Sequence, residues 1–282
     1  MLKNYLTVAF RNLRKQRGYT VVNVTGLALG LACSALIALF VRHEHAYDRF
    51  HERADRIVRV TYEEVDTPAM RHMATTPPPL GPTLAATYPE VRRAVRLREP
   101  HPSILARGPE RFYERDFFYA DSTFFRVFTF PLRAGDAATA LAGAGRVVLT
   151  PAAARKYFGE ADPMGQTLTL NDEVDLTVTG VLEPLPHASQ LQFDFLVSFE
   201  TFRVPHGYPV TLESWTWSSF HTYLLLAEGA DAELLEARLP DFMGTYFDAE
   251  RARTARLRLQ PLTDVYLGAP RHPAIAAGNA TA

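Results

Sequence analysis

Close to its start, the chain has an apolar stretch that carries no charged residue from Thr20 to Val41. As a helix this stretch reaches roughly 33 Å, enough to cross a hydrocarbon core about 30 Å thick. A buried helix of a soluble protein would show a polar stripe, whereas the polar residues here are few and small. We therefore predict a transmembrane helix over residues 18–42. Because residues 41–45 offer no small-x-small cleavage site, we expect this helix to remain as an anchor.

The segment before this helix has one apolar and one basic face. Leu2, Leu6, Phe10 and Leu13 recur at three- and four-residue steps, which predicts an amphipathic helix over residues 1–17 that lies on membrane lipid. The basic residues of the segment are Lys3, Arg11, Arg14, Lys15 and Arg17. No acidic residue accompanies them. The positive-inside rule therefore predicts a cytoplasmic N-terminus and an extracytoplasmic location for everything after Arg42.

Small residues recur within the predicted span, at Gly26, Ala28, Gly30 and Ala32. This spacing lets a second helix approach closely. Glycine and alanine are also simply common in bacterial spans, so the sequence leaves both interpretations open. The one cysteine of the chain, Cys33, lies in the same stretch, which excludes an intrachain disulfide.

Strand and helix patterns alternate from residue 43 to residue 282, and no later window is apolar enough for a second span. Strands are predicted within 54–64 and 256–262. Strict alternation on both sides of Asn171-Asp172 predicts a β-hairpin over 167–181. Helices are predicted within 79–91 and over 150–159, where Thr150 can cap the start and Gly159 the end. A further helical face, bent or split by Pro240, runs from Leu235 to Tyr246. This mixture predicts an α+β domain.

Composition narrows the function. The chain has 282 residues, 47% of them hydrophobic, and a net charge of −1. Near-neutral charge argues against a nucleic-acid partner, which usually requires a basic face. The sequence has neither a G-x-x-x-x-G-K-[ST] phosphate loop nor a G-x-S-x-G elbow. We therefore expect no enzyme, and we assign no catalytic, cofactor-binding or metal-binding residue.

Three groups of residues suggest a binding or catalytic function, but a structural role explains each of them better. His43, Glu44, His45 and His51 suggest a metal site, but an H-E-x-x-H motif would need histidine where Tyr47 stands. We interpret them as a solvated helix next to the membrane. Phenylalanines dense between residues 112 and 130 are expected to pack in a core rather than to stack on single-stranded nucleic acid. The carboxylates of this region are interpreted as strand-end and turn residues: Asp116, Asp121 and Asp136.

Several blocks resemble one family. The first begins with MLKNYLTVAFRNLRKQRG, continues through the N-x-x-GLALG start of the span and ends with YDRFHERADRIVRV. The similarity continues through ADSTFFRVFTFPLRAGD (120–136), VVLTPAAARKYFGEADPMGQTLTL (147–170), VTGVLEPLPHASQLQFDFLVSFETF (178–202) and LQPLTDVYL (259–267). Over nearly its whole length, the chain resembles MacB/FtsX-like ABC transporter permeases of the Bacteroidetes type.

The resemblance implies a fold with an N-terminal amphipathic helix, one transmembrane helix and a two-lobed mixed α/β extracytoplasmic domain over residues 43–282. One lobe would comprise residues 45–100 and 215–282, and the inserted lobe residues 101–214. Such permeases have three further spans, so we expect the chain to be the N-terminal portion of a permease.

The resemblance also implies a function. The chain would lie in the bacterial inner membrane with its main domain in the periplasm, and would transmit ATPase-driven motion to that domain for export or extraction of a substrate. Its partners would be a separate ABC ATPase subunit, a second permease copy or half, membrane lipid and a periplasmic or outer-membrane protein. Two alternatives remain: a single-pass periplasmic binding or sensor protein, and a membrane-anchored hydrolase, which the missing motifs disfavour.

Overall fold

A computed structural model describes residues 13–64, 71–99, 102–202 and 212–268, together with Tyr5, Val8 and Arg11. The chain separates into two compact units, Met1–Ala46 and Tyr47–Ala282. We describe each unit by itself.

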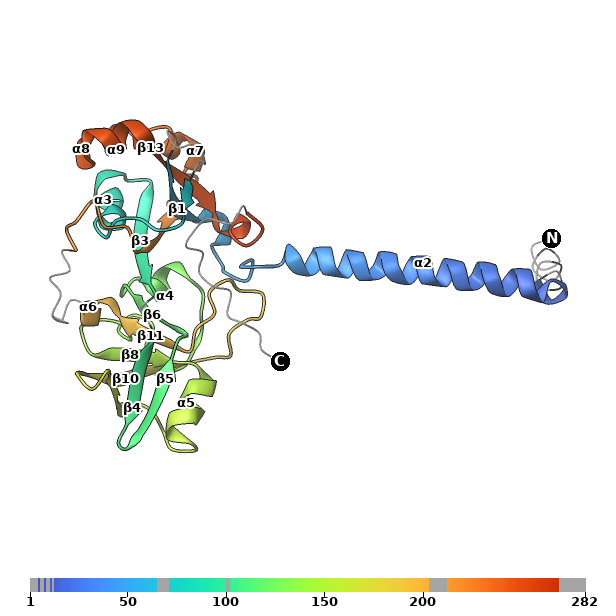
Figure 1. The fold of residues 1–282 in the computed structure, drawn as a ribbon, viewed down its shortest axis with the longest axis horizontal. Coiled ribbons are helices and arrows are strands. Elements are labelled where there is room, and N and C mark those ends of the chain that lie inside the picture. Colours follow the sequence, from blue (N-terminus) through green and yellow to red (C-terminus); the bar gives the residue numbers. More distant parts are fainter. Residues whose placement is uncertain are drawn as a thin grey trace. The chain divides into compact units, whose positions relative to one another are not determined.

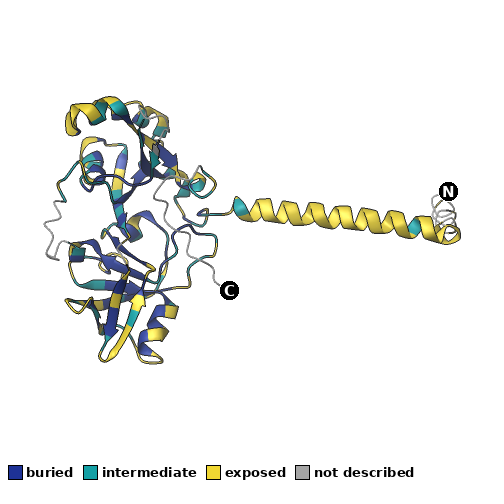
Figure 2. Cartoon of the chain, in the orientation of Figure 1, coloured by how far each residue is buried: buried dark blue, intermediate teal, exposed yellow. Residues whose placement is uncertain are grey.

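The first unit contains the predicted membrane helix. Helix α2 runs over Arg17–Glu44 and buries none of its residues: Figure 2 shows it mostly exposed, with Thr20 and Glu44 of intermediate exposure. Among the described residues, α2 is the one helix long and apolar enough to cross a membrane. The described residues of the preceding segment, Tyr5, Val8, Arg11 and 13–15, are helical. Leu2, Leu6 and Phe10, which carry the predicted lipid-facing side, lie outside the described residues.

The second unit is a mixed α+β domain (Figure 1). Its strands are β1 Ile57–Glu64, β2 Arg71–Met73, β3 Val91–Arg98, β4 Ser103–Arg107, β5 Glu110–Glu114, β6 Phe117–Ala120, β7 Leu132–Gly135, β8 Arg146–Leu149, β9 Thr167–Leu170, β10 Val174–Leu182, β11 Phe195–Ser198, β12 His221–Leu226 and β13 Ala255–Pro261. Its helices are η1 Ala54–Arg56, α3 Leu80–Thr87, α4 Phe124–Val127, α5 Pro151–Phe158, α6 Phe199–Phe202, α7 Ala232–Glu236, α8 Leu239–Tyr246, α9 Ala249–Thr254 and η2 Leu262–Asp264.

These strands form one continuous sheet in the order β13-β1-β12-β3-β6-β11-β8-β10-β9-β4-β5, while β2 pairs with β1 and β7 with β10. The pairs β6–β11 and β8–β10 are parallel and the others are antiparallel. Strands β13, β1, β12 and β3 therefore make one part of the sheet, and β4 to β11 make the other. The two parts join where β3 pairs with β6, at Leu97 opposite Ala120.

The domain has three apolar clusters, which follow this sheet. One packs α3, α7 and α8 on the part that contains β1 and β13. A second packs α5 on the part that contains β8 to β10. The third spans the joint and draws on both parts, with Ile57, Leu97 and Tyr223 on one side and Phe118 and Leu196 on the other. The joint is thus packed as core rather than left as a hinge.

Most of the phenylalanines between residues 112 and 130 belong to the central cluster or, for Phe117, to the second one. The buried ones are Phe117, Phe118, Phe124, Phe128 and Phe130. Phe124, Phe128 and Phe130 also contact one another ring against ring. This confirms core packing for that aromatic-rich segment.

Local sequence rules explain several elements. The β9–β10 hairpin turns at Asn171 and Asp172, whose φ angles of 52° and 59° suit residues that tolerate the left-handed region. The side chain of Thr150 accepts from the Ala153 amide at the start of α5, as predicted for a helix cap. The C-terminal helical face is split into α7 and α8, because the ring of Pro240 is incompatible with the Glu236 carbonyl of a continuous helix.

The helix predicted within 79–91 is confirmed, and α3 ends at Thr87. Tyr88 is extended, with φ −113° and ψ 116°, because it precedes Pro89 and such residues disfavour the helical region. The chain then starts β3 at Val91.

Candidate functional site: the polar network at Asp48 and His51

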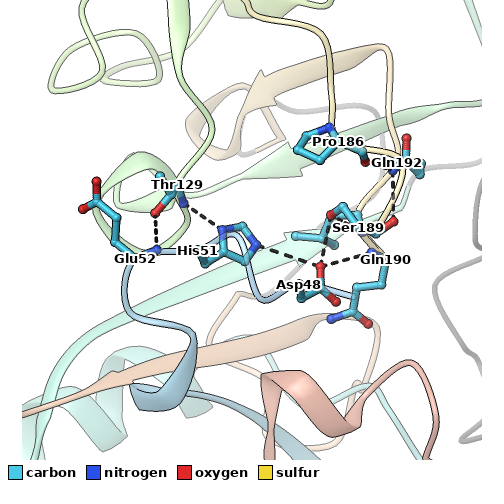
Figure 3. Close-up of polar contacts among 9 residues, drawn as sticks. Asp48, His51, Glu52, Thr129, Pro186, Ser189, Gln190 and Gln192 are labelled. Atoms are coloured by element: carbon cyan, nitrogen blue, oxygen red, sulfur yellow. Dashed lines mark hydrogen bonds and ion pairs between the residues drawn. The ribbon is translucent and has the colours of Figure 1, made fainter. Parts of the chain in front are cut away.

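A buried polar network holds the first residues of the domain (Figure 3). The side chain of Asp48 lies in the interior, and its Oδ1 accepts hydrogen bonds from Ser189 Oγ and from the Gln190 amide, each at 3.1 Å. The Asp48 amide donates to the Ala188 carbonyl at 2.8 Å. Residue 48 is thus bound on both backbone and side chain to the segment 188–190, which precedes β11.

The backbone of Asp48 is left-handed, with a φ of 57°. Aspartate and asparagine tolerate this region better than other residues that carry a Cβ atom, because their short polar side chains can bond locally. An alanine at this position would lose that bonding and retain the strain. Residue type and backbone conformation therefore agree at Asp48.

His51 makes the second attachment. Its Nδ1 accepts from the Thr129 amide at 3.0 Å, and the next residue, Glu52, donates its amide to Thr129 Oγ1 at 3.1 Å. The imidazole packs against Phe50, Phe128 and Phe130, at centroid distances of 4.0, 5.3 and 5.2 Å. Because Nδ1 is an acceptor, the neutral ring carries its proton on Nε2, which lies 3.9 Å from Asp48 Oδ1.

Burial shifts the pKa values of both groups. Loss of solvent raises the pKa of Asp48 to about 6, although its bonds to Gln190 and Ser189 oppose the shift. Loss of solvent lowers the pKa of His51 to about 4. At neutral pH the site therefore holds an ionised Asp48 beside a neutral His51.

An aromatic stack joins the same region to the end of the described domain. The rings of Tyr47 and Tyr266 lie parallel, with centroids 3.5 Å apart and planes at 5°. Tyr266 follows η2, whose Leu262 is fully buried in the central cluster. The domain's first residue and one of its last described residues are therefore in contact.

The geometry does not support a hydrolase. A serine nucleophile needs a histidine that bridges the serine to the acid. Here Ser189 donates directly to Asp48, and the Nδ1 atom of His51 is occupied by a backbone amide. Ser189 also has only 1% of its surface exposed, so no substrate reaches it. Asp48, His51 and Ser189 therefore have a structural role: their hydrogen bonds attach the start of the domain to its core.

The residues that the sequence singled out lie elsewhere or act structurally. His43, Glu44 and His45 belong to the first unit and His51 to the second. Within the described ranges, no group of three or more His, Cys, Asp and Glu side chains is placed to hold a metal ion.

The three aspartates that the sequence singled out have structural contacts, through the carboxylate in Asp121 and Asp136 and through the backbone in Asp116. Asp121 forms a two-point ion pair with Arg96, at 2.8 and 2.9 Å. Asp136 accepts from the Ala138 amide and closes a turn. The Asp116 carbonyl accepts from the Asp194 amide, beside the start of β11.

The sequence did not predict the network, although the segments that form it lie within the blocks that carry the family resemblance. YDRFH contributes Tyr47, Asp48 and His51, the block 120–136 contributes Thr129, and the block 178–202 contributes Ser189 and Gln190. LQPLTDVYL contributes Tyr266. The pattern that would have pointed to the site is a titratable pair, Asp48 and His51, set among aromatic residues shortly after a helix of membrane-spanning length.

The fold is thus an α+β domain preceded by one helix of membrane-spanning length. A family model described as the MacB-like periplasmic core domain matches residues 20–242. The chain belongs to this family. No curated protein matches the chain significantly.

Solved structures share the fold. A domain assigned to a permease protein of Porphyromonas gingivalis is 24% identical with a TM-score of 0.63, and the match covers 75% of this chain and 91% of that one. The periplasmic region of MacB from Actinobacillus actinomycetemcomitans is 13% identical with a TM-score of 0.53, over 74% and 91%. The extracellular domain of the noncanonic ABC-type transporter YknZ from Gram-positive bacteria is 14% identical with a TM-score of 0.51, over 72% and 99%.

The shifted pKa values of Asp48 and His51 predict opposite effects on stability. A raised pKa, as for Asp48, gives stability that is complete below about pH 4 and is lost as the pH rises through about 6. A lowered pKa, as for His51, costs stability as the pH falls from about 6.5 towards 4. The two contributions largely cancel in the natural chain.

We therefore expect Asp48→Asn and His51→Gln to change the pH dependence of the free energy of unfolding in opposite directions. Between pH 4.5 and 5.5, the free energy of unfolding should rise with pH more steeply in Asp48→Asn and less steeply in His51→Gln, each by roughly 1 kcal/mol per pH unit. Tryptophan fluorescence during urea unfolding in neutral detergent measures this. Glu228→Gln, at a side chain 96% exposed, is the control and should leave the slope unchanged. Equal slopes in all four proteins would contradict the assignment.

Proposed function

We propose that the chain is part of the permease subunit of an ABC transporter and passes ATPase-driven motion from its membrane helix to its periplasmic domain. Membership of the MacB-like periplasmic core domain family supports this, because that family belongs to transporter permeases rather than to enzymes. Helix α2 supplies the membrane segment that such a role requires.

The observation that carries the proposal is the fixed start of the domain. Helix α2 ends at Glu44, and the first residue bound to the domain is Tyr47. Three residues span at most about 11 Å, so little free chain lies between the helix and the buried attachment at Asp48. A displacement of the helix end therefore pulls on core residues instead of being absorbed by a flexible linker.

The domain itself is proposed to act as two lobes, residues 45–100 with 215–282 and residues 101–214. The strand pairing supports this division, because β1, β3, β12 and β13 pair among themselves and β4 to β11 do likewise, apart from the β3–β6 contact. The packed cluster at that contact would carry motion from the first lobe to the second.

The proposed surroundings follow from the same role. The N-terminus would be cytoplasmic, α2 would cross the inner membrane, and the domain would lie in the periplasm. An ABC ATPase and a second permease copy or half would supply the driving motion. A periplasmic or outer-membrane protein would receive it. The basic residues before α2, among them Arg11, Arg14 and Lys15, favour this orientation.

Reporter fusions test the orientation. Alkaline phosphatase fused after residue 60 should be active, because the enzyme folds only outside the cytoplasm and the positive charges keep the N-terminus inside. A cytoplasmic reporter at the same position should be inactive. The reverse result at this one position would overturn the proposed topology.

Affinity capture tests the function. A tag inserted in the exposed β4–β5 turn at Gly108, in the chromosomal gene, leaves both ends of the protein and the Asp48 network untouched. Capture in mild detergent should recover a Walker-motif ATPase in stoichiometric amount, and an untagged strain should not. Recovery of no ATPase above that background would reject the permease and favour the single-pass binding or sensor protein.

A further inference from the structure

An arginine-lined cavity lies beside the start of β1. It has a volume of about 630 Å³, within the range of ligand-binding pockets. Four arginines line it, two from the segment around η1 and two from the start of β3: Arg53, Arg56, Arg92 and Arg93. The rest of the lining is Leu225, Ala227 and Glu228, at the end of β12.

A β-bulge places two of these arginines together. Along β3 and β12, Arg93 pairs with Leu225 but Val91 pairs with Leu226, so Arg92 is an extra residue in its strand. Neighbours in a regular strand point to opposite faces of the sheet. A bulge re-aims side chains, and here both Arg92 and Arg93 line the one cavity.

Backbone hydrogen bonds next to His51 position the other two arginines. The Ala54 amide donates to the His51 carbonyl at 3.1 Å, and the Arg56 amide to the Arg53 carbonyl at 2.9 Å. These bonds close η1, which Arg53 precedes and Arg56 ends. This segment therefore places Arg53 and Arg56 on the same cavity as the bulge of β3.

The cavity has far more positive than negative charge. Its one carboxylate, Glu228, lies 3.8 Å from Arg56 and is 96% exposed. Arg53, Arg92 and Arg93 form no ion pair with any described residue, and the buried Arg53 Nε has no hydrogen-bond partner there. A neighbouring pocket that Arg92 and Arg93 also line contains Asp121, but both of its oxygens are bound to Arg96.

Other arginines of the domain do have close carboxylate partners. Arg238 pairs with Glu90 at 2.5 Å, and Arg258 contacts both Glu63 and Glu236. Arg53, Arg92 and Arg93 differ from them in this respect. Guanidinium groups stay charged at all working pH values and repel one another, and their planar forks match the oxygens of phosphate in two-point contacts.

We infer that this cavity binds a phosphate-bearing ligand. Two sources carry this chemistry, a soluble phosphate ester and a phospholipid headgroup. Arg53 lies nine residues after Glu44, the last residue of α2, and this stretch spans at most about 32 Å. This short connection makes a lipid headgroup a candidate beside a soluble ester. The inference does not depend on the transport function, because it rests only on the arginines and the bulge.

Calorimetric titration of the full chain in dodecyl maltoside tests this. One arm uses sn-glycerol 3-phosphate and the other dihexanoyl-phosphatidylglycerol, with glycerol as the uncharged blank. We expect saturable binding of at least one phosphate probe. Arg92→Gln/Arg93→Gln should weaken it tenfold or more. Arg53→Gln, on a different segment, should weaken it several-fold, which guards against a local folding defect in β3.

The control is the double variant Arg115→Gln/Arg126→Gln, which removes the same charge from exposed positions outside the cavity. It should bind within twofold of the natural chain. Binding of the ester would assign a soluble ligand, and binding of the lipid alone would assign a headgroup. The inference fails if neither probe binds, if the cavity variants bind normally, or if the control loses as much affinity as they do.

Discussion

Asp48 has a left-handed backbone and a fully buried side chain, and one oxygen of its carboxylate accepts hydrogen bonds from both Ser189 and Gln190. A buried carboxylate is costly unless such donors surround it. The contact therefore holds only while the segment 188–190 stays in place against the first residues of the domain. Through it, and through His51 and Thr129, the chain that follows α2 becomes part of the core.

The hydrogen-bond network at Asp48 and His51 bears on both proposals made for the domain, the transmission of motion and the binding of a phosphate group. The network leaves almost no free chain between α2 and the core, which suits the proposed transmission of motion from helix to domain. It also fixes η1, and so sets Arg53 and Arg56 beside the bulged start of β3.

Local rules predicted much of the fold from the sequence. The cap of Thr150, the turn at Asn171-Asp172 and the break before Pro240 each follow from a residue and its neighbours. The sheet order and the two parallel pairs were not predicted, because they join segments far apart in the chain. The network at Asp48 was missed for the same reason: its partners Thr129 and Ser189 lie far along the sequence.

Hydrogen exchange of the full chain in detergent tests the central claim, that the backbone at residues 48–52 is held against the core. The amides to follow are those of Asp48, Glu52 and Thr129, which donate to Ala188, Thr129 and His51. We predict protection equal to that of the β1 amides at Val58 and Val60, because only opening of the core would release them. Exchange as fast as at the exposed residues Gly143 and Ala144 would show a flexible linker and contradict the account.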